Sequence, residues 1–295
     1  MDSSKRIGVV TVTYNSGKVL EEFLDSIGAQ THRDFLLYAV DNASQDSTLA
    51  QLDAWGDERL RVIRNTVNVG IAMGDNQGTR AALADGCDYV MFLNNDVEFE
   101  PETFAILVAE VDALDCDILA PKILFGDRIH IWSAGGTFTP IKGYLSYNRG
   151  EGERDHGQFD QPTRITFAPG CCYLVRRAVL ERIGEFDERY FVYHEDADFF
   201  FRAWRAGMTM FYTHRAQIFH KVSALTGLRS TFTIRYNARG HVYFMLKNLG
   251  LLRCLYYLPA LQLRLLMKVL MRTISWDEFL IRENAFFEGI GVWLS

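Results

Sequence analysis

The sequence predicts an α/β protein with an open, mostly parallel central sheet flanked by helices, followed by a C-terminal helical extension. Short β-branched segments alternate with amphipathic stretches up to residue 114, and polar residues follow successive predicted strands. After residue 245 the composition changes, and apolar stretches carry regularly spaced cations. With 295 residues, of which 48% are hydrophobic and 23% charged, the chain can bury a large core.

The N-terminal elements are predicted from their periodicity. Residues 7–13 form a continuous β-branched run, which is typical of a buried parallel strand. Residues 18–29 place their large apolar side chains on one helical face. The same reasoning predicts strands at 35–40, 60–64 and 89–93, and helices at 44–55, 76–85 and 101–114. Strands and helices in this alternating order predict a parallel sheet.

Polar clusters follow three of the predicted strands. They lie at Thr13–Ser16, Asp41–Ser44 and Asn94–Asp96. In open α/β sheets, ligands bind beyond the carboxyl ends of the strands. We therefore expect these clusters to line one crevice, although they are far apart in the sequence.

From residue 115 onward the pattern is less regular, with longer loops between the elements. We expect strands at 118–121, 132–138, 164–167, 209–214 and 217–220, and helices at 177–183 and 196–206.

Charge and cysteine content exclude several classes of protein. The net charge is −6, so there is no basic excess that would indicate a nucleic-acid partner. The five cysteines lack the paired spacing of zinc sites, and we expect buried, reduced thiols. The sequence shows no signal peptide and no run of ~20 uncharged residues. We therefore expect a cytoplasmic chain without a transmembrane helix.

The segment 249–272 is predicted to be an apolar helix despite Pro259. Arg264, Lys268 and Arg272 are spaced four apart, so they form one basic stripe. Three interpretations remain open: a packing helix with solvated cations, an interfacial helix on an anionic membrane, or a contact between copies of the chain.

An acidic cluster at Glu195, Asp196 and Asp198 lies between aromatic residues. Carboxyl groups held against apolar walls can have a raised pKa, which suits a general base. The alternative is a helix start, where acids lie near the positive end of the helix dipole. Asp198 is expected to pair with Arg202, one helical turn later.

Two other segments could bind a metal or a phosphate. Asp96 follows a strand and suits Mg²⁺ or Mn²⁺, and His220 could supply an imidazole; turn formation and a structural histidine are the alternatives. The glycine-rich segment 68–78 precedes a helix, whose first amides favour phosphate, or it forms a tight turn. It lacks the signatures of a P-loop and of a dinucleotide site.

These motifs occur in a distinctive order. They are Val-Thr-Val-Thr-Tyr-Asn (10–15), Asp-Asn-Ala-Ser-Gln-Asp-Ser-Thr (41–48), Asn-Val-Gly-x-Ala-x-Gly-x-Asn-x-Gly (68–78), Leu-Asn-Asn-Asp-Val (93–97), Pro-Gly-Cys-Cys-Tyr-Leu-Val-Arg-Arg (169–177), Gly-Glu-Phe-Asp-Glu-Arg-Tyr-Phe (184–191) and His-Glu-Asp-Ala-Asp-Phe (194–199). The series, over residues 7–225, resembles the inverting family 2 glycosyltransferases with the GT-A fold, and most of all their bacterial rhamnosyltransferase branch. The resemblance implies a GT-A domain at 1–245, with a nucleotide-sugar half at about 1–120 and an acceptor half at 121–245, and a helical extension at 246–295.

The resemblance also implies roles for individual residues. Asp196 would be the catalytic base, with Glu195 supporting it, and Asp96 and His220 would hold Mg²⁺ or Mn²⁺. Asn94 stands where the family has the first Asp of its Asp-x-Asp metal motif. The nucleotide-binding positions would be Thr13, Tyr14, Asn15, Asp41, Asn42, Asn68, Gly70 and Asn95, and the acceptor-side positions Trp132, Gly135 and Gly136.

The expected reaction is transfer of rhamnose from dTDP-rhamnose, by single displacement with inversion, to a hydroxyl of a surface-polysaccharide or lipid-linked acceptor. Two alternatives have the same fold: a UDP-sugar-dependent galactofuranosyl-, glucosyl- or N-acetylhexosaminyltransferase, or a non-catalytic nucleotide-sugar binding protein. A nicotinamide-dependent oxidoreductase is a third. Besides donor and acceptor, the expected partners are the inner face of the cell membrane, through 249–272, and a second copy of the chain.

Overall fold

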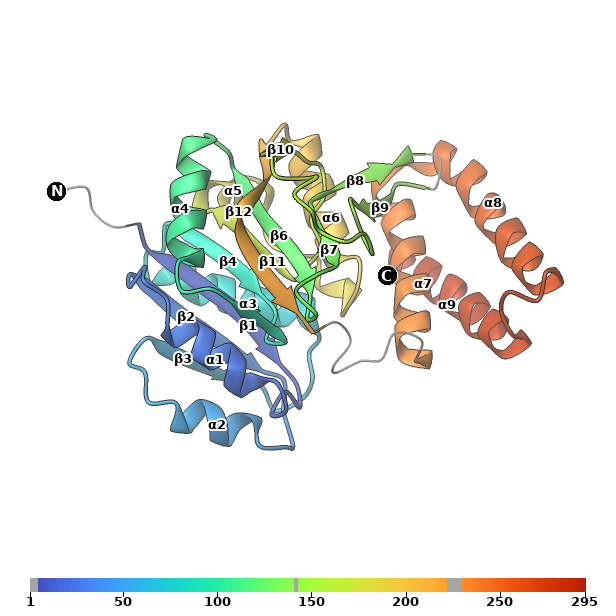
Figure 1. The fold of residues 1–295 in the computed structure, drawn as a ribbon. Coiled ribbons are helices and arrows are strands. Elements are labelled where there is room, and N and C mark those ends of the chain that lie inside the picture. The colour runs from blue at the N-terminus through green and yellow to red at the C-terminus, as the bar shows by residue number, and fades with distance from the viewer. Residues whose placement is uncertain (1–4, 141–142, 222–229) are drawn as a thin grey trace.

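The structure is a computed structural model that describes residues 5–140, 143–221 and 230–295. Within these ranges, ten strands form one mixed sheet in the order β10-β12-β6-β11-β4-β1-β2-β3, with β5 paired to β12 and β7 to β6 (Figure 1). Two more strands, β8 and β9, form a separate hairpin. The strand bounds are β1 Ile7–Thr13, β2 Phe35–Asp41, β3 Leu60–Arg64, β4 Tyr89–Leu93, β5 Val97–Phe99, β6 Ile118–Phe125, β7 Ile131–Ser133, β8 Gly136–Thr139, β9 Leu145–Asn148, β10 Thr163–Arg164, β11 Cys172–Arg176 and β12 Met210–His220.

The sheet is parallel over its N-terminal part. Strands β3, β2, β1 and β4 pair in parallel, as the alternation of strands and helices predicted. Strand β11 comes from much later in the chain and lies antiparallel between β4 and β6. Its first residue, Cys172, pairs with Leu93, the last residue of β4. The segment before β11 therefore lies at the carboxyl end of β4, where the polar turn Asn94–Asp96 begins.

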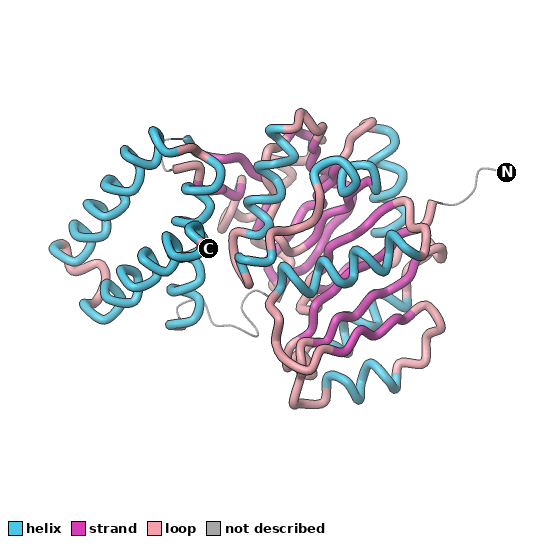
Figure 2. The backbone as a smooth tube through the Cα atoms, turned by 180° about the vertical axis from the view of Figure 1, so that it is seen from behind, coloured by secondary structure: helices cyan, strands magenta, loops and turns pink. Residues whose placement is uncertain are grey.

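Helices cover both faces of the sheet (Figure 2). Apolar side chains of α1, α2 and α4 belong to one core cluster, and those of α3, α5 and α6 belong to the other. The helix bounds are α1 Leu20–Gly28, α2 Thr48–Ala54, α3 Ile71–Ala84, α4 Thr103–Ala113, α5 Arg177–Ile183, α6 Glu195–Arg205, α7 Thr231–Asn248, α8 Leu251–Leu270 and α9 Trp276–Leu294. The predicted α/β architecture with a mostly parallel sheet is confirmed.

Helix α3 starts at Ile71, so the prediction of a helix at 76–85 was wrong about where it begins. The glycines of this segment lower its helix propensity, and the sequence pattern therefore hides the first turns. The fold uses these glycines for close packing against β1. A Cβ on Gly74 would lie 2.7 Å from Val12 Cγ2, and one on Gly78 would lie 2.4 Å from Val10 Cγ1.

Several strand predictions were also wrong. The strand expected at 132–138 is interrupted, because β7 ends at Ser133 and β8 begins at Gly136 in a separate hairpin. The strands expected at 209–214 and 217–220 form one strand, β12, whose pairing with β6 shifts register between Thr213 and Gln217. Such an irregularity breaks the alternation of buried and exposed residues, which made one strand look like two. The strand expected at 164–167 is reduced to the two residues of β10.

Helices α7, α8 and α9 stand together beside the sheet domain (Figure 1), and the predicted extension at 246–295 comprises the end of α7 together with α8 and α9. Helix α7 continues across residues 245 and 246, where the sequence suggested a domain boundary. Pro259 lies inside α8 without ending it. In the described ranges, no helix combines the length and the apolar character needed to cross a bilayer. The five cysteines are buried and unpaired.

Candidate active site

A short segment before β11 connects the acidic helix α6 to the turn that follows β4. The backbone amide of Gly170 donates a 2.8 Å hydrogen bond to Oδ2 of Asp196. The next carbonyl, that of Cys171, accepts a 2.9 Å hydrogen bond from the amide of Asn94. Because β11 is inserted beside β4, two candidate functional regions far apart in the sequence share one edge of the sheet.

The chain turns sharply just before Asp196. Phe191, Tyr193 and His194 have φ values of 63°, 61° and 70°, a left-handed conformation that bulky residues rarely adopt. Contacts with the glycine-rich segment hold this turn: Ile71 donates its amide to the Phe191 carbonyl at 2.6 Å, and a Cβ on Gly70 would lie 2.4 Å from the same oxygen. Strained backbone of this kind persists where surrounding structure enforces it, and it is frequent at functional sites.

Three carboxyl groups surround the start of α6. Burial raises the pKa of Asp196, which is partly buried. Burial, and then the charge of Asp196, raise the pKa of the buried Glu195 well above its usual range. The same two causes, in the same order, raise the pKa of Asp75 on α3. These carboxyl groups therefore hold protons to a higher pH than ordinary acids, which is the property required of a general base near neutral pH.

The environment of Glu195 favours the neutral form of its carboxyl group. Its Oε2 is buried and has no hydrogen-bond partner among the described residues. Asp196, by contrast, accepts hydrogen bonds from the amides of Gly170 and Ala197, which favour its charged form. Glu195 and Asp196 therefore differ in acidity, and Asp196 is the group that ionises more readily.

Asp198 lies in an ion-pair network that stabilises the fold. Its predicted pairing with Arg202 is confirmed, with Nε of Arg202 2.8 Å from Oδ2 of Asp198. The side chain is completely buried. Lys247 and Asn248 of α7 also contact it, at 2.9 and 2.8 Å. Asp198 therefore joins α6 to α7 and is not available to a substrate.

The structure brings the two predicted metal ligands together. Nε2 of His220, at the end of β12, lies 3.2 Å from Oδ1 of Asp96. The indole of Trp132, predicted to be on the acceptor side, packs edge-on against the imidazole with ring centroids 4.5 Å apart. This pair lies at the edge of the sheet because β12 and β5 are adjacent, with His220 opposite Val97.

The side chains of Asp96 and His220 are of the types that bind divalent cations. One carboxylate oxygen and one imidazole nitrogen face each other, and both side chains are nearly buried. No cluster of three or more potential ligands occurs in the described part of the chain. A hard cation would therefore take its remaining ligands from phosphate oxygens and water, as Mg²⁺ commonly does.

The predicted nucleotide-binding residues at the ends of β1 and β2 contact one another. Oγ1 of Thr13 donates to Oδ1 of Asp41 at 2.9 Å, and the amide of Ser44 donates to Oδ2 at 3.0 Å. Asn15 has a positive φ of 52° and accepts the amide of Gln45. Beside this buried network, the ring of Tyr14 is 48% exposed, so an aromatic surface is available at the edge of the crevice.

The remaining nucleotide-binding candidates lie around the start of α3. Nδ2 of Asn42 donates to the Gly70 carbonyl, and the Gly70 amide donates to Oδ1 of Asn68. Asn95 donates to the Val12 carbonyl at 2.6 Å, which ties the turn after β4 to β1. The amides of Gly70 and Ile71 are thus already used at the helix start, and this geometry favours the tight-turn interpretation of the segment.

Gly135 and Gly136 have packing roles in the structure. A Cβ on Gly135, whose φ is +77°, would lie 2.6 Å from Ile165 Cγ2. A Cβ on Gly136 would lie 2.5 Å from the Tyr147 carbonyl. These glycines let the β8–β9 hairpin approach its neighbours closely, while Trp132 lies beside His220.

Sequence reasoning did not assign roles to Asp75 or Gly170, although both lie within recognised motifs. Asp75 is the only acid within 68–78, which was a usable signal. Nothing in the sequence shows that the amide of Gly170 faces Asp196, because that contact depends on where β11 enters the sheet.

A protein-family model described as "Glycosyl transferase family 2" matches residues 8–184. The chain belongs to this family. Among curated proteins, the N-acetylglucosaminyl-diphospho-decaprenol L-rhamnosyltransferase of Mycobacterium tuberculosis is 29% identical over 238 residues, which cover 74% of this chain and 77% of the relative. The O-antigen biosynthesis protein RfbC of Myxococcus xanthus is 27% identical over 74% of this chain but only 17% of its own length.

Solved structures identify the fold of this glycosyltransferase as GT-A. The mannosyltransferase PcManGT of Pyrobaculum calidifontis, in complex with GDP-Man and Mn²⁺, has a TM-score of 0.60 at 15% identity and covers 98% of this chain and 84% of its own. GalNAc-T7 with UDP, GalNAc and Mn²⁺ has a TM-score of 0.63 at 17% identity over 81% of this chain, and this chain spans about half (48%) of that one.

Proposed function

We propose that this family 2 member is an inverting, divalent-metal-dependent glycosyltransferase. It moves rhamnose from dTDP-rhamnose to a hydroxyl of a lipid-linked or surface-polysaccharide acceptor. The observation that carries the proposal is the position of Asp196: Gly170 holds this carboxylate at the same edge of the sheet as the Asp96–His220 pair. The rhamnosyl donor is supported by the name of the Mycobacterium tuberculosis relative.

In this mechanism, Asp196 accepts the proton of the acceptor hydroxyl while the hydroxyl oxygen attacks the anomeric carbon. The new carbon–oxygen bond forms as the bond to the nucleoside diphosphate breaks, so a single displacement inverts the configuration. Asp96 and His220 would hold Mg²⁺ or Mn²⁺, whose charge offsets that of the departing diphosphate. Positioning of the reactants typically contributes ~7–11 kcal/mol, and base catalysis ~10²–10⁴-fold.

We assign the donor to the edge formed by the ends of β1, β2 and β4. Thr13 and Asp41 build the buried floor, and Tyr14 offers an exposed ring at its rim. The acceptor half would then comprise residues 121–245, in which α6 presents the base. Glu195, whose free Oε2 is buried, is suited to donate a hydrogen bond to an acceptor oxygen while protonated.

A lipid-linked acceptor also requires access to a membrane surface, and α8 offers an apolar face for that contact. Leu252 is 85% exposed, and further exposed apolar residues lie along the same helix: Leu251, Leu255, Tyr256, Leu263, Leu266, Met267 and Leu270. An isolated exposed leucine would need no explanation, but a row of this length is typical of an interaction surface. We propose peripheral membrane contact through 249–272, with a homodimer as the competing use of this face.

A thermal-shift panel of nucleotide sugars with Mg²⁺ or Mn²⁺ tests the donor assignment. A ligand at 100 times its Kd stabilises the folded protein by ~2.7 kcal/mol, which is readily detected. We expect dTDP-rhamnose with metal to give the largest shift; a larger shift with a UDP-sugar would reassign the donor. If the best donor binds but is neither transferred nor hydrolysed, the chain is a nucleotide-sugar binding protein instead.

A further inference from the structure

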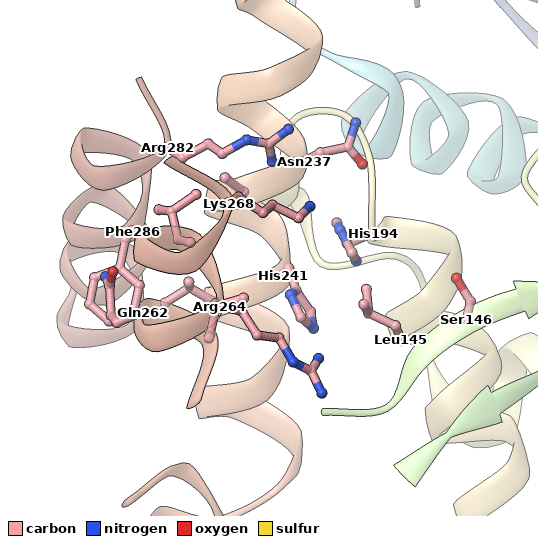
Figure 3. Close-up of a pocket in the computed structure, with 14 residues that line it drawn as sticks. Leu145, Ser146, His194, Asn237, His241, Gln262, Arg264, Lys268, Arg282 and Phe286 are labelled. Atoms are coloured by element: carbon pink, nitrogen blue, oxygen red, sulfur yellow. The ribbon is translucent and has the colours of Figure 1, made fainter. Parts of the chain in front are cut away.

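A cavity of about 450 Å³ lies between the sheet domain and the C-terminal helices (Figure 3). Its walls come from β9, from α7, α8 and α9, and from the turn that carries His194. His194 precedes Asp196, the proposed base, by two residues. The cavity therefore adjoins the turn that leads into the helix carrying Asp196.

Cations dominate the charge of this cavity. Arg264, Lys268 and Arg282 line it, and no carboxylate of the described residues does so. Arg282 is neutralised by Glu278 at 2.7 Å, whereas the side chains of Arg264 and Lys268 have no ion-pair partner in the described ranges. The first two members of the basic stripe predicted from the sequence thus line a cavity, and an anion would offset their charge.

His241 provides a second, independent indication of a ligand. The residue is only 7% exposed and lines the cavity, yet its Nε2 has no hydrogen-bond partner within the described part of the chain. Burial, and to a smaller extent the charge of Arg264, lower the pKa of His241 to about 4, although a backbone hydrogen bond with Gly143 acts in the opposite direction. A neutral imidazole at neutral pH can donate one hydrogen bond to an anion without itself carrying a charge.

Apolar side chains form the rest of the wall. Leu145, Val242, Leu261, Leu265 and Phe286 face the same space as the cations. A cavity that is cationic and apolar at once suits an amphiphile with a phosphate head and a hydrocarbon tail. Residues 261–268 of α8 line the cavity with one face, and the exposed apolar row lies along the same helix.

We propose that this cavity binds the diphosphate group and the first isoprenoid units of a lipid-linked acceptor, through Arg264, Lys268 and His241. The inference rests on the proposed function, because it takes the acceptor to be a lipid diphosphate. Binding there holds the acceptor lipid at the membrane side of the protein and leaves its sugar free to reach Asp196.

Calorimetric titration of the full chain with geranyl diphosphate, in the absence of detergent and membrane, tests the subsite. The double variant Arg264→Gln/Lys268→Gln should raise the Kd at least about tenfold, since hydrogen bonds to charged groups are commonly worth that much. Arg272→Gln is the matched control, because it removes the same charge just beyond α8 and outside the cavity. Arg272→Gln should change the Kd by no more than about twofold, which is well below the tenfold change expected from the loss of one strong contact.

Three results would overturn the subsite: no binding by the wild type, equal Kd values for the double variant and the wild type, or equal weakening by Arg272→Gln. Inorganic diphosphate and dTDP serve as further probes. If either binds the wild type as tightly as geranyl diphosphate and is weakened by the same double variant, the site is not one for a lipid. Binding of dTDP-rhamnose with Mn²⁺ is measured on the same samples; its failure in the wild type refutes the donor assignment and not the lipid-diphosphate site.

Discussion

Lys247 and Asp198 form an ion pair that joins the C-terminal helices to the helix carrying the proposed base. Nζ of Lys247 lies 2.9 Å from a carboxylate oxygen of Asp198, and the same ammonium group contacts Asp187 at 2.7 Å. Two residues before Asp198, the side chain of Asp196 points instead toward Gly170. Neighbouring acids in one short motif thus have different surroundings, one inside an ion-pair network and the other beside the backbone of Gly170.

Replacing Asp198 with Asn should destabilise the fold by about 2–3 kcal/mol. Removing one partner of a buried ion pair typically costs ~3–5 kcal/mol, and the value is reduced here because Arg202 and Lys247 are about a quarter exposed. Urea denaturation measures the difference. The matched control is Glu181→Gln, which breaks the exposed helical pair with Arg177 and should cost at most ~0.5 kcal/mol. Equal effects of the two variants would refute the structural role of Asp198.

Asp196→Asn should lower turnover by at least ~10²-fold while leaving donor affinity nearly unchanged, because the amide cannot accept the acceptor proton. The measurement is initial rate together with calorimetric donor binding. In the wild type, kcat/KM should rise with pH through a pKa above the usual aspartate value of 3.8, since burial raises the pKa of this carboxyl. Near-normal transfer by the variant would reject Asp196 as the base.

Asp96→Asn should abolish stimulation of transfer by Mn²⁺, because the pair loses its charged ligand. Asp127→Asn is a well-matched control: Asp127 also contacts a histidine, His130, at 2.6 Å, but on the surface. Activity is measured with Mn²⁺ and with excess EDTA for each protein. If wild-type transfer is the same under both conditions, the proposed metal dependence is wrong.

Asp75→Asn should stabilise the protein at pH 8, and the gain should shrink as the pH falls toward 4. The pKa of Asp75 is raised in the folded state, first by burial and then by the charge of Asp196. Its contribution to stability is therefore fully present below the unfolded-state pKa and is lost as pH rises through the folded-state value. Asparagine removes the cost of that ionisation, and each kcal/mol relieved raises Tm by about 2–4 °C in large domains.

The control for this measurement is Asp127→Asn, whose effect should have the opposite sign. Hydrogen bonds from His130 lower the pKa of Asp127 to about 2, so its ionised form favours folding at neutral pH. Melting temperatures between pH 5 and 8 compare the two variants. A gain for Asp75→Asn that grows at acidic pH would contradict the assignment.

Leu252→Asn combined with Leu255→Asn should weaken binding to anionic vesicles at low salt. Each leucine is well exposed, at 85% and 66%, so these changes spare the fold while removing apolar area from α8. Leu294→Asn, at an equally exposed position of α9, serves as the control and should bind as the wild type does. Vesicle co-sedimentation and light scattering are measured together. Loss of a dimer without any vesicle binding would assign this face to a second copy of the chain.

The strand-end residues show how far sequence reasoning extends. Asp41 and Asp96 were placed at one sheet edge because parallel strands end together, and the structure places them at the ends of β2 and β4. Gly74 was placed before the helix, since its packing against β1 leaves no local signal. The cavity around His241 was not predicted, because its walls come from five separate parts of the chain.

The sequence by itself determined the alternation of strands and helices, the polar strand ends and the family, because periodicity and motif order are local properties of the chain. Only the tertiary structure decided what surrounds each acid. Lys247 of α7 reaches Asp198, and Gly170 reaches Asp196 because β11 enters the sheet beside β4. Arg264 and Lys268 of α8 line a cavity for the same reason: their surroundings depend on contacts between segments that the sequence keeps far apart.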